Sequence, residues 1–496
     1  HARLCFPSPS TPVCRASLWS RPARGRAAAP ARPPPLLLLL TEMLAFSHAA
    51  LALTARPERV WAIGDLHGDA GCAQHWVERT RLISNVSAPP EEWEWTDPSA
   101  KLVFMGDYID RGPEARAVLT FVRELTTRFP DNVHALLGNH ELNLLVDRAR
   151  PEGNGRYLEY AYAAAHPAQY AAWLPGGEDE PGSADVLRAL HDALLLVYRR
   201  QLHGQGVLMT PEGPSSVVHF VQPAAMRPRV AESMRRWQTA YLRGVGTRTP
   251  LGAWVQRPLS VLLADTLFVH GGIPEELLDM VVPATRNAPA VALGSPGGLA
   301  VLNARWLNAS RSARVGALAP RRGESEAEAE AAEARALAGS EELLHLASEM
   351  VEYRGLHDSY AGRYRDRHSR DAKPAQVACE RVHALLRRLN VSRIAVGHTP
   401  EDNVRIRCGG RLLALDSTLS RSFRAHGNYY CDAHMEREEP RICPPRNEAC
   451  EGQIIRLERR PLDVQVPAAP WLLHVVESEW DQERDEGAIE DMKMEL

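Results

Sequence analysis

Residues 102–112 read LVFMGDYIDRG, an apolar run that ends in a cluster of glycine, acidic side chains and arginine. A short continuous apolar run bounded by glycine is typical of a strand buried on both faces, and glycine allows the chain to turn sharply after it. Residues 113–129 then begin with Pro113 and repeat apolar side chains along one helical face, which predicts a helix. The stretch therefore predicts a strand, a turn and a helix, with polar side chains at the end of the strand.

The same arrangement of apolar run and polar cluster occurs four more times. The other clusters are GDLHG at 64–68, GNHE at 138–141, HGG at 270–272 and GHT at 397–399. Strands that alternate with helices predict an α/β fold with parallel elements. Because ligands in such folds gather at the carboxyl ends of the strands, we expect the five clusters to converge although they are far apart in the chain.

The converging side chains are carboxylates, an amide and imidazoles, which suit divalent metals such as manganese, iron or zinc. A single open catalytic site needs fewer ligands, whereas two ions about 3.5–4 Å apart, bridged by a carboxylate, would use them all. Asp110, Arg111 and His140 stand in the same clusters and would supply a proton donor, its orienter and a phosphate clamp. The expected metal ligands are Asp65, His67, Asp107, Asn139, His270 and His398.

In this order, GDxHG, GDxxDRG, GNHE, HGG and GHT resemble the PPP-type metallophosphoesterases of the calcineurin-like phosphoesterase superfamily. The resemblance is closer to the Shewanella-like protein phosphatases, on the segments GRYL at 155–158, LGAWV at 251–255, YRG at 353–355 and DSTLS at 416–420. It covers roughly residues 58–430. It implies an α/β fold, the metallophosphoesterase four-layer α/β/β/α sandwich, with a helical insertion.

The resemblance also implies the metal chemistry. Two divalent ions are expected, manganese first of all in vitro, with iron or zinc as alternatives. A hydroxide bridging the ions would attack phosphorus directly, without a phosphoenzyme. One ion would be held by Asp65, His67 and Asp107, and the other by Asp107, Asn139, His270 and His398, with Asp107 bridging.

The remaining roles implied by the resemblance concern the proton and the phosphate. His140 would protonate the leaving oxygen, and Asp110 would hold the imidazole of His140. Arginine side chains would bind the phosphoryl oxygens, one of them in the Tyr-Arg-Gly segment. The expected phosphate-binding residues are Arg111, Asn139 and Arg354, with Arg305 as the alternative to Arg354.

Three functions are compatible with this ligand set. The leading hypothesis is a metal-dependent phosphoprotein phosphatase acting on phosphotyrosine, phosphoserine or phosphothreonine. The alternative is a small-molecule phosphohydrolase of the diadenosine tetraphosphatase type; those enzymes typically carry GNHD, and Glu141 in this chain favours the phosphoprotein hypothesis. A non-catalytic binding protein on the same fold is disfavoured, because no residue of the ligand set is missing.

Composition limits the partners. The 496 residues include 58 Lys and Arg against 62 Asp and Glu, a net charge of −4, so we expect no nucleic-acid partner. The apolar fraction of 45% is ordinary for a globular protein that buries a core. The expected partner is a phosphoprotein substrate, and the oligomeric state stays open.

The first 56 residues form a distinct leader. Six arginines and no acids in 1–32, followed by an apolar stretch at 36–53, are typical of a signal or transit peptide. A membrane anchor is the alternative if the leader is not cleaved. By the leader, we expect the chain in the secretory pathway, including the endoplasmic reticulum lumen, or in the chloroplast. If part of the leader is untranslated and Met43 or a later residue is the true start, the chain would be cytoplasmic.

The domain boundaries follow from these observations. Residues 57–430 form the expected metallophosphoesterase domain, with a helical insertion at about 146–258, whose aromatic residues we expect in the core, and an Ala/Glu-rich insertion at about 310–345. Residues 431–496 are a cysteine-containing extension with an acidic tail.

The cysteines give a separate expectation. Cys72 and Cys379 fall in predicted amphipathic helices and are expected to be core thiols. In a secretory compartment the four C-terminal cysteines could form two disulfides, in any of three connectivities. These four are Cys408, Cys431, Cys443 and Cys450.

Overall fold

The computed structural model describes residues 59–148, 167–174, 176, 183–202, 209–210, 213–214, 226–246, 249–283, 290–295, 297–318, 341–357, 374–426, 449–459 and 471–477. The chain divides into one unit from His1 to Thr54 and another from Ala55 to Leu496, and every described residue belongs to the second. The leader, the GRYL segment, Cys431, Cys443, the acidic tail and most of the Ala/Glu-rich insertion lie outside the described residues. Within the described ranges, no helix has the length and apolar character needed to cross a membrane.

The first of two five-stranded sheets has the strand order β16-β15-β1-β4-β5. Its parallel part consists of β1 (Arg59–Ile63), β4 (Ala100–Phe104) and β5 (Val133–Ala135). On the other side of β1, β15 (Gln453–Arg459) pairs antiparallel with it, and β16 (Trp471–Glu477) pairs antiparallel with β15. From the sequence the metallophosphoesterase domain was expected to end at residue 430, but these two later strands belong to the same sheet.

The second sheet has the order β13-β14-β12-β9-β8. Its centre is β12 (Arg393–Val396), which runs parallel to both β14 (Leu412–Ala414) and β9 (Thr266–Val269). The two edge strands, β13 (Arg405–Arg407) and β8 (Ser260–Leu263), are antiparallel to their neighbours. Five of the six parallel strands of the two sheets, all except β14, are the apolar runs from which the fold was predicted.

Alternate residues of each strand point to opposite faces of its sheet. The residues on one face of each sheet pack against the other sheet, so the two sheets lie face to face. Val60 and Ala62 of β1 lie in one buried cluster with Phe268 of β9 and Ala395 of β12. Ile63 instead belongs to a second buried cluster that includes the helices. The predicted α/β/β/α sandwich is therefore confirmed: helices cover the outer face of each sheet.

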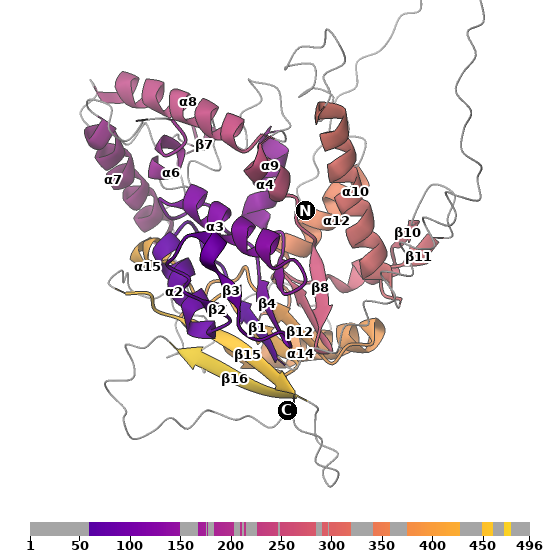
Figure 1. Ribbon diagram of the computed structural model, residues 1–496. Helices are drawn as coiled ribbons and strands as arrows, with labels where there is room; N and C mark the ends of the chain where they lie inside the picture. Colours follow the sequence, from indigo (N-terminus) through magenta and orange to yellow (C-terminus); the bar gives the residue numbers. More distant parts are fainter. Residues whose placement is uncertain are drawn as a thin grey trace, which may run out of the picture. The chain divides into compact units, whose positions relative to one another are not determined.

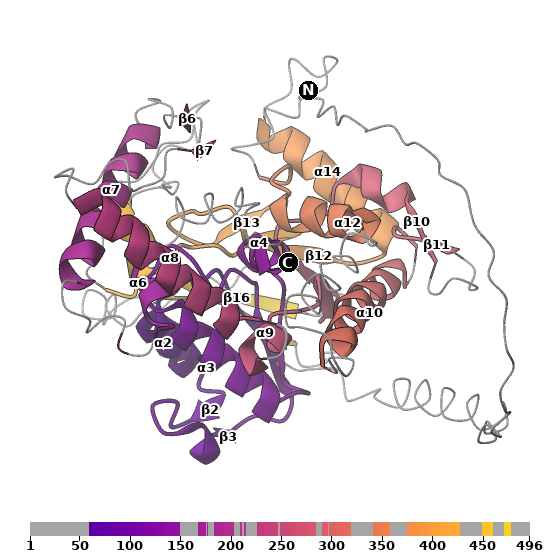
Figure 2. The ribbon, with the colours of Figure 1, turned by 90° about the horizontal axis from the view of Figure 1, so that it is seen from above.

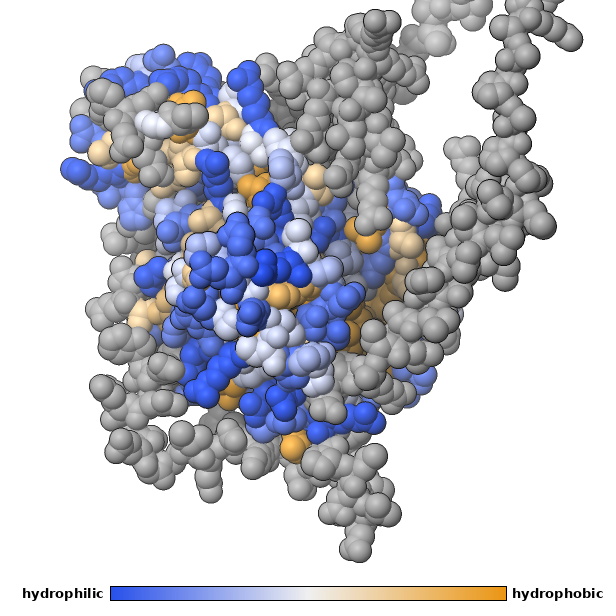
Figure 3. Space-filling view, viewed as in Figure 1, coloured by the Kyte–Doolittle hydropathy of each residue, from blue (hydrophilic) through white to orange (hydrophobic). Residues whose placement is uncertain are grey.

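The helix layers lie on opposite sides of the sheets (Figures 1 and 2). One side carries α2 (Ala70–Thr80) and α3 (Ala115–Arg128), and α3 contacts β5. The other side carries α10 (Gly298–Leu318), α12 (Glu341–Glu352) and α14 (Pro374–Leu389), and α14 contacts β12. On the face viewed in Figure 3 the described surface is mainly hydrophilic, with apolar residues in small separate areas.

The described part of the helical insertion contains four helices, α6 (Pro167–Ala171), α7 (Ser183–Leu202), α8 (Arg227–Gly244) and α9 (Pro250–Trp254), besides a short strand pair. Trp237 of α8 is fully buried, and Tyr170 of α6 packs edge-on against Tyr241 of α8, with 5.1 Å between ring centroids. These aromatic residues belong to the core, as expected. The remaining short elements are α4 (Asn139–Arg148), α15 (Arg421–His426), β2 (Ile83–Ser84), β3 (Glu94–Trp95), β6 (Met209–Thr210), β7 (Gly213–Pro214), β10 (Val281–Pro283) and β11 (Ala290–Ala292), and 3-10 turns at Pro90–Glu92 and Glu275–Asp279.

The cysteine expectations were wrong in two respects. Cys72 and Cys379 are not core thiols but disulfide-bonded, to Cys450 and Cys408 respectively. The described pairs therefore do not form within the C-terminal group of four. The physical reason is the sheet topology: β15 lies beside β1, so the segment before β15 reaches α2, and the Cα atoms of Cys72 and Cys450 lie 5.3 Å apart despite a separation of 378 residues.

Candidate metal centre

The structure places the six predicted metal ligands close together, and four of them fall in two groups of potential ligand atoms, while Asp65 and Asn139 contact His398. Each of the six stands just after a parallel strand: β1, β4, β5, β9 or β12. Two groups of potential ligand atoms form, one from His67, Asp107 and His140 and the other from Asp107, His270 and His398, and within each group the atoms lie within 4.8 Å of one another. Asp107 belongs to both groups, which is the place expected of a bridging carboxylate.

In the second group, nitrogen and oxygen atoms crowd around one point. His270 Nε2 lies 3.3 Å from Asp107 Oδ1, and Asn139 Oδ1 lies 3.0 Å from His270 Nε2 and 2.9 Å from His398 Nδ1. If the Asn139 amide is reversed, its nitrogen instead faces the Asp107 carboxylate at 3.1 Å. A divalent ion would satisfy this donor set with the amide oxygen turned inward.

Backbone contacts orient two of the imidazoles. His67 Nδ1 lies 3.1 Å from the Ile109 carbonyl, and His270 Nδ1 lies 2.8 Å from the Met105 carbonyl. When Nδ1 donates to a carbonyl, the Nε2 lone pair is free for a metal. In both residues Nε2 faces Asp107, at 3.7 Å and 3.3 Å.

Asp65 carries a buried oxygen that a cation would satisfy. The side chain is 1% exposed, and its Oδ2 accepts the backbone N–H of His398 at 3.0 Å. Its Oδ1 receives no hydrogen bond from any described residue, and the same is true of Oδ2 of the neighbouring Asp416. Buried carboxylate oxygens without a donor are costly, so the donor set fits divalent ions.

The electrostatics of the site agree with this interpretation. Burial, followed by the charges of Asp416 and Asp107, raises the pKa of Asp65 well above its usual value. Burial lowers the pKa of His67 and of His398 well below the usual imidazole value, so both rings are neutral and able to act as ligands.

The ligand loops adopt strained backbone conformations. The φ angles of His67, Asp107 and His398 are 40°, 52° and 66°, a left-handed region that residues with a side chain rarely enter. Gly138 is required by close approach, because a Cβ there would lie 2.2 Å from Asp107 Oδ1. Such conformations persist only where surrounding contacts hold them.

Glu141 supplies those contacts. Its buried carboxylate accepts the backbone N–H groups of Asp107 and Tyr108 at 2.8 Å each, and those of Ile109 and Gly138 at 3.2 Å each. Burial and the Asp107 charge raise the pKa of Glu141 to about 8 even with these bonds. From the sequence, Glu141 bears only on the class of enzyme, whereas in the structure its carboxylate holds the Asp107 loop.

His140 and Asp110 form the predicted pair. His140 Nδ1 lies 2.5 Å from Asp110 Oδ2, and His140 Nε2 faces the metal ligands, 3.8 Å from Asp107 Oδ2. Burial lowers the pKa of His140, but the charges of Asp107 and Asp110 outweigh it and the pKa is raised. A protonated imidazole aimed at the centre has the geometry of a general acid.

Two of the three candidate phosphate arginines lie at the site. The Arg111 guanidinium stacks on the Phe423 ring at 5.1 Å from its centroid, next to the His67 loop. Arg354 Nη1 donates to Thr399 Oγ1 at 3.3 Å, and after burial its charge is the largest cause lowering the pKa of His398. In the part of the chain that the structure describes, Arg305 of α10 makes no hydrogen bond or ion pair to a metal ligand.

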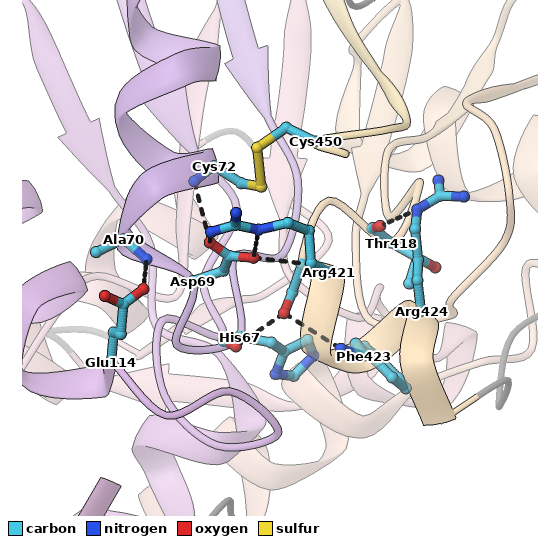
Figure 4. Close-up of a disulfide and its surroundings, with 11 residues drawn as sticks. His67, Asp69, Ala70, Cys72, Glu114, Thr418, Arg421, Phe423, Arg424 and Cys450 are labelled. Atoms are coloured by element: carbon cyan, nitrogen blue, oxygen red, sulfur yellow. Dashed lines mark hydrogen bonds and ion pairs between the residues drawn. A yellow bond between two sulfur atoms is a disulfide. The ribbon is translucent and has the colours of Figure 1, made fainter. Parts of the chain in front are cut away.

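Residues outside the predicted set fix the His67 loop (Figure 4). Ser420 Oγ donates to the His67 carbonyl at 3.1 Å. The Arg421 guanidinium donates to both carboxylate oxygens of Asp69, at 2.7 and 3.0 Å, and Asp69 in turn caps α2 by accepting the N–H of Cys72. The DSTLS segment, which carried part of the resemblance, and the following α15 therefore pack directly on the first metal-binding loop.

The comparisons with known proteins agree with this geometry. Residues 58–214 match the family described as calcineurin-like phosphoesterase. Shewanella-like protein phosphatase 2 of Arabidopsis thaliana is 33% identical over 106 residues, which cover 21% of this chain and 24% of that protein. The symmetrical bis(5'-nucleosyl)-tetraphosphatase of a Janthinobacterium species is 39% identical over 86 residues, 17% of this chain and 25% of that protein.

Among solved structures, the cold-active protein-tyrosine phosphatase of a psychrophilic Shewanella species aligns over 85% of this chain and 80% of its own, with 16% identity and a TM-score of 0.42. The chain spans between 24% and 31% of the length of the first three curated relatives that it matches. The family match covers the strands β1, β4 and β5 and the loops that carry Asp65, His67, Asp107 and Asn139. Residues 58–214 therefore form a calcineurin-like phosphoesterase domain, and the relatives support a metallophosphoesterase of the PPP type.

Proposed function

We propose that this metallophosphoesterase is a phosphoprotein phosphatase that uses two divalent ions to hydrolyse phosphotyrosine, phosphoserine or phosphothreonine. The observation that carries the proposal is the position of Asp107, shared by two groups of ligand atoms beside the His140–Asp110 pair. The similarity to a Shewanella-like protein phosphatase supports the phosphoprotein substrate.

The chemistry divides between the ions and the side chains. Two bound ions would supply a hydroxide nucleophile and neutralise phosphoryl charge. Arg111, Arg354 and the Asn139 amide would bind the phosphoryl oxygens. His140 would give its Nε2 proton to the departing ester oxygen, while Asp110 keeps Nδ1 in place.

A second candidate function has its own support. The similarity to a symmetrical bis(5'-nucleosyl)-tetraphosphatase favours hydrolysis of a dinucleoside polyphosphate. Glu141, which favoured a phosphoprotein in the sequence analysis, bonds four backbone N–H groups. These bonds give Glu141 a structural role that is the same for either substrate. Turnover assays therefore have to decide between the two candidate substrates.

The test is turnover by the full chain with Mn²⁺, followed as release of inorganic phosphate from the phosphopeptides and as formation of ADP from the dinucleotide. The substrates are a tyrosine phosphopeptide, a serine/threonine phosphopeptide and diadenosine tetraphosphate, and Asp107→Asn serves as the blank. Turnover of a phosphopeptide that disappears in the blank supports the proposal. Turnover of the dinucleotide alone supports the second candidate, and no turnover with Mn²⁺, Fe²⁺ or Zn²⁺ would support a non-catalytic binding protein.

The number of bound metal ions needs a separate measurement. Reconstitution followed by elemental analysis should give about two ions per chain for the wild type. Asp107→Asn should hold fewer, because it removes the negative charge shared by both ligand groups.

A further inference from the structure

A glutamine of the helical insertion reaches the His140–Asp110 pair. Gln169, on α6, is fully buried and makes two hydrogen bonds to Asp110. The Asp110 backbone N–H donates to Gln169 Oε1 at 2.7 Å, and Gln169 Nε2 donates to Asp110 Oδ1 at 2.7 Å. One side chain therefore holds both the backbone and the carboxylate of Asp110.

With the bond from Gln169, both carboxylate oxygens of Asp110 have a hydrogen-bond partner. Asp110 Oδ1 is held by Gln169, and Asp110 Oδ2 is held by Nδ1 of His140 at 2.5 Å. Asp110 also has a φ angle of 67°, a left-handed backbone conformation that residues with a side chain rarely adopt. Contacts with neighbouring residues therefore have to stabilise it. Without Gln169, the 6%-exposed Asp110 would keep a buried oxygen without a donor, and its carboxylate would be free to turn away from His140.

The anchor of Gln169 is the insertion itself. Its neighbour Tyr170 is 1% exposed and packs on Tyr241 of α8, and α6 also contacts α7. The core motifs place His140 and Asp110, and the insertion places the residue that locks their orientation. This gives the helical insertion a direct connection to the proton donor.

We propose that Gln169 is a positioning residue for the reaction proposed above, on which this inference rests. In that reaction the hydroxide oxygen bonds to phosphorus as the bond from phosphorus to the ester oxygen breaks. The electron pair of that bond stays on the ester oxygen, which takes the proton from Nε2 of His140. The ring ends neutral and keeps its Nδ1–H bond to Asp110, so Gln169 acts by keeping Asp110 turned toward His140.

The leaving group separates this role from a merely structural one. The phenolate of phenyl phosphate is a poor leaving group, with a pKa of about 10, and needs the proton. The p-nitrophenolate of p-nitrophenyl phosphate is a stabilised anion and leaves without it. Damage to proton transfer therefore slows the first ester more than the second, whereas loss of folded protein or of metal slows both equally.

The main variant is Gln169→Met, which keeps the volume and removes both hydrogen bonds. We expect kcat for phenyl phosphate to fall about tenfold or more, with a small change in KM, and kcat for p-nitrophenyl phosphate to fall by less than about threefold. His140→Asn should show the same pattern more strongly. Gln169→Glu keeps the acceptor but places a like charge against Asp110, and should resemble Gln169→Met.

The matched control is Gln238→Met. Gln238 is a second buried glutamine of the insertion, 7% exposed on α8, and its amide nitrogen has no hydrogen-bond partner among the described residues. Its substitution should leave the ratio of the two esters unchanged. Equal ratios in Gln169→Met and wild type, or an equal shift in Gln238→Met, would overturn the positioning role.

A second readout does not depend on turnover. The strongly hydrogen-bonded Nδ1 proton of His140 should give a low-field proton NMR resonance, assigned by its absence in His140→Asn. In Gln169→Met this resonance should move upfield or exchange away, while Gln238→Met should retain it. An unchanged resonance in Gln169→Met contradicts the inference even if the variant is unstable in assays. A wild type that hydrolyses neither ester refutes the proposed function itself.

Discussion

Asp107 adopts a left-handed backbone conformation and lies in both groups of ligand atoms. Its loop is held by Glu141, whose carboxylate spans three successive N–H groups, from Asp107 to Ile109. At the residue scale, the geometry of the centre therefore depends on the length of the Glu141 side chain as much as on the ligands.

Shortening Glu141 by one methylene should loosen this loop. Glu141→Asp cannot reach all four N–H groups, so we expect Mn²⁺ affinity to fall about 10–100-fold, the usual cost of losing a supporting contact. The measurement is metal binding by titration calorimetry. Glu141→Gln keeps the length but replaces one accepting oxygen by an amide donor, so it tests whether both carboxylate oxygens are needed. If Glu141→Asp binds Mn²⁺ as tightly as the wild type, Glu141 does not position the ligand loop.

His134 on β5 should make stability depend on pH. Burial, and then the nearby Lys101 charge, lowers the pKa of His134 to about 4, while the unfolded chain has the ordinary value of 6.5. Between these values the unfolded chain binds more protons, so stability is fully present above pH 6.5 and is lost as the pH falls toward 4. We expect a loss of about 2–3 kcal/mol in urea unfolding over this range.

The variant His134→Gln isolates this contribution. It does not titrate, so the pH dependence of its unfolding free energy should be flatter than that of the wild type between pH 6.5 and 4. Parallel curves for the two proteins would show that His134 is protonated in the folded state over the same range as in the unfolded chain.

At the residue scale, the sequence predicted those functional residues that come soon after the end of an apolar strand. The six predicted metal ligands, His140 and Asp110 come soon after apolar runs, so the topology of parallel strands brings them together. Gln169 has no such marker. It lies 59 residues from Asp110, in a segment without a motif, and only the packing of the insertion reveals it.

At the element scale, the five apolar runs are the parallel strands β1, β4, β5, β9 and β12 of the structure. The helix expected at 113–129 is α3, because Val118, Leu119 and Val122 form one buried stripe. The strands β13 to β16 were not predicted. They are short, or lie beyond the motifs, and their pairing depends on partners far away in the chain.

The disulfide between Cys72 and Cys450 joins α2 to the segment before β15, beside the Asp69–Arg421 ion pair. Closing so long a loop restricts the unfolded chain, and we expect the double variant Cys72→Ser, Cys450→Ser to lose about 2–4 kcal/mol of unfolding free energy. Urea unfolding measures it. The pair Cys379→Ser, Cys408→Ser, which closes a loop of 29 residues, is the comparison and should cost less. A larger loss in the comparison would contradict the loop-length argument.

At the scale of the whole molecule, two disulfides between distant elements support the proposal that the chain matures in an oxidising compartment rather than in the cytoplasm. We therefore expect non-reduced peptide mapping of the protein from its native cells to yield cross-linked peptides for Cys72–Cys450 and Cys379–Cys408. Fluorescence imaging of the full chain should place it in the secretory pathway or the chloroplast. Free thiols at all four positions, with cytoplasmic fluorescence, would support a start at or after Met43.

The pairing of β1 with β15 has a consequence for biosynthesis. Arg59 is opposite Glu458, a difference of 399 residues, so β1 emerges from the ribosome long before its partner on that side. At ordinary elongation rates of 5–20 residues per second, the interval is about 20 to 80 s. Throughout it, one edge of the strand that leads into the first metal-binding loop stays open to pairing with other chains. Chaperones that bind nascent chains would have to cover this edge until translation is almost finished.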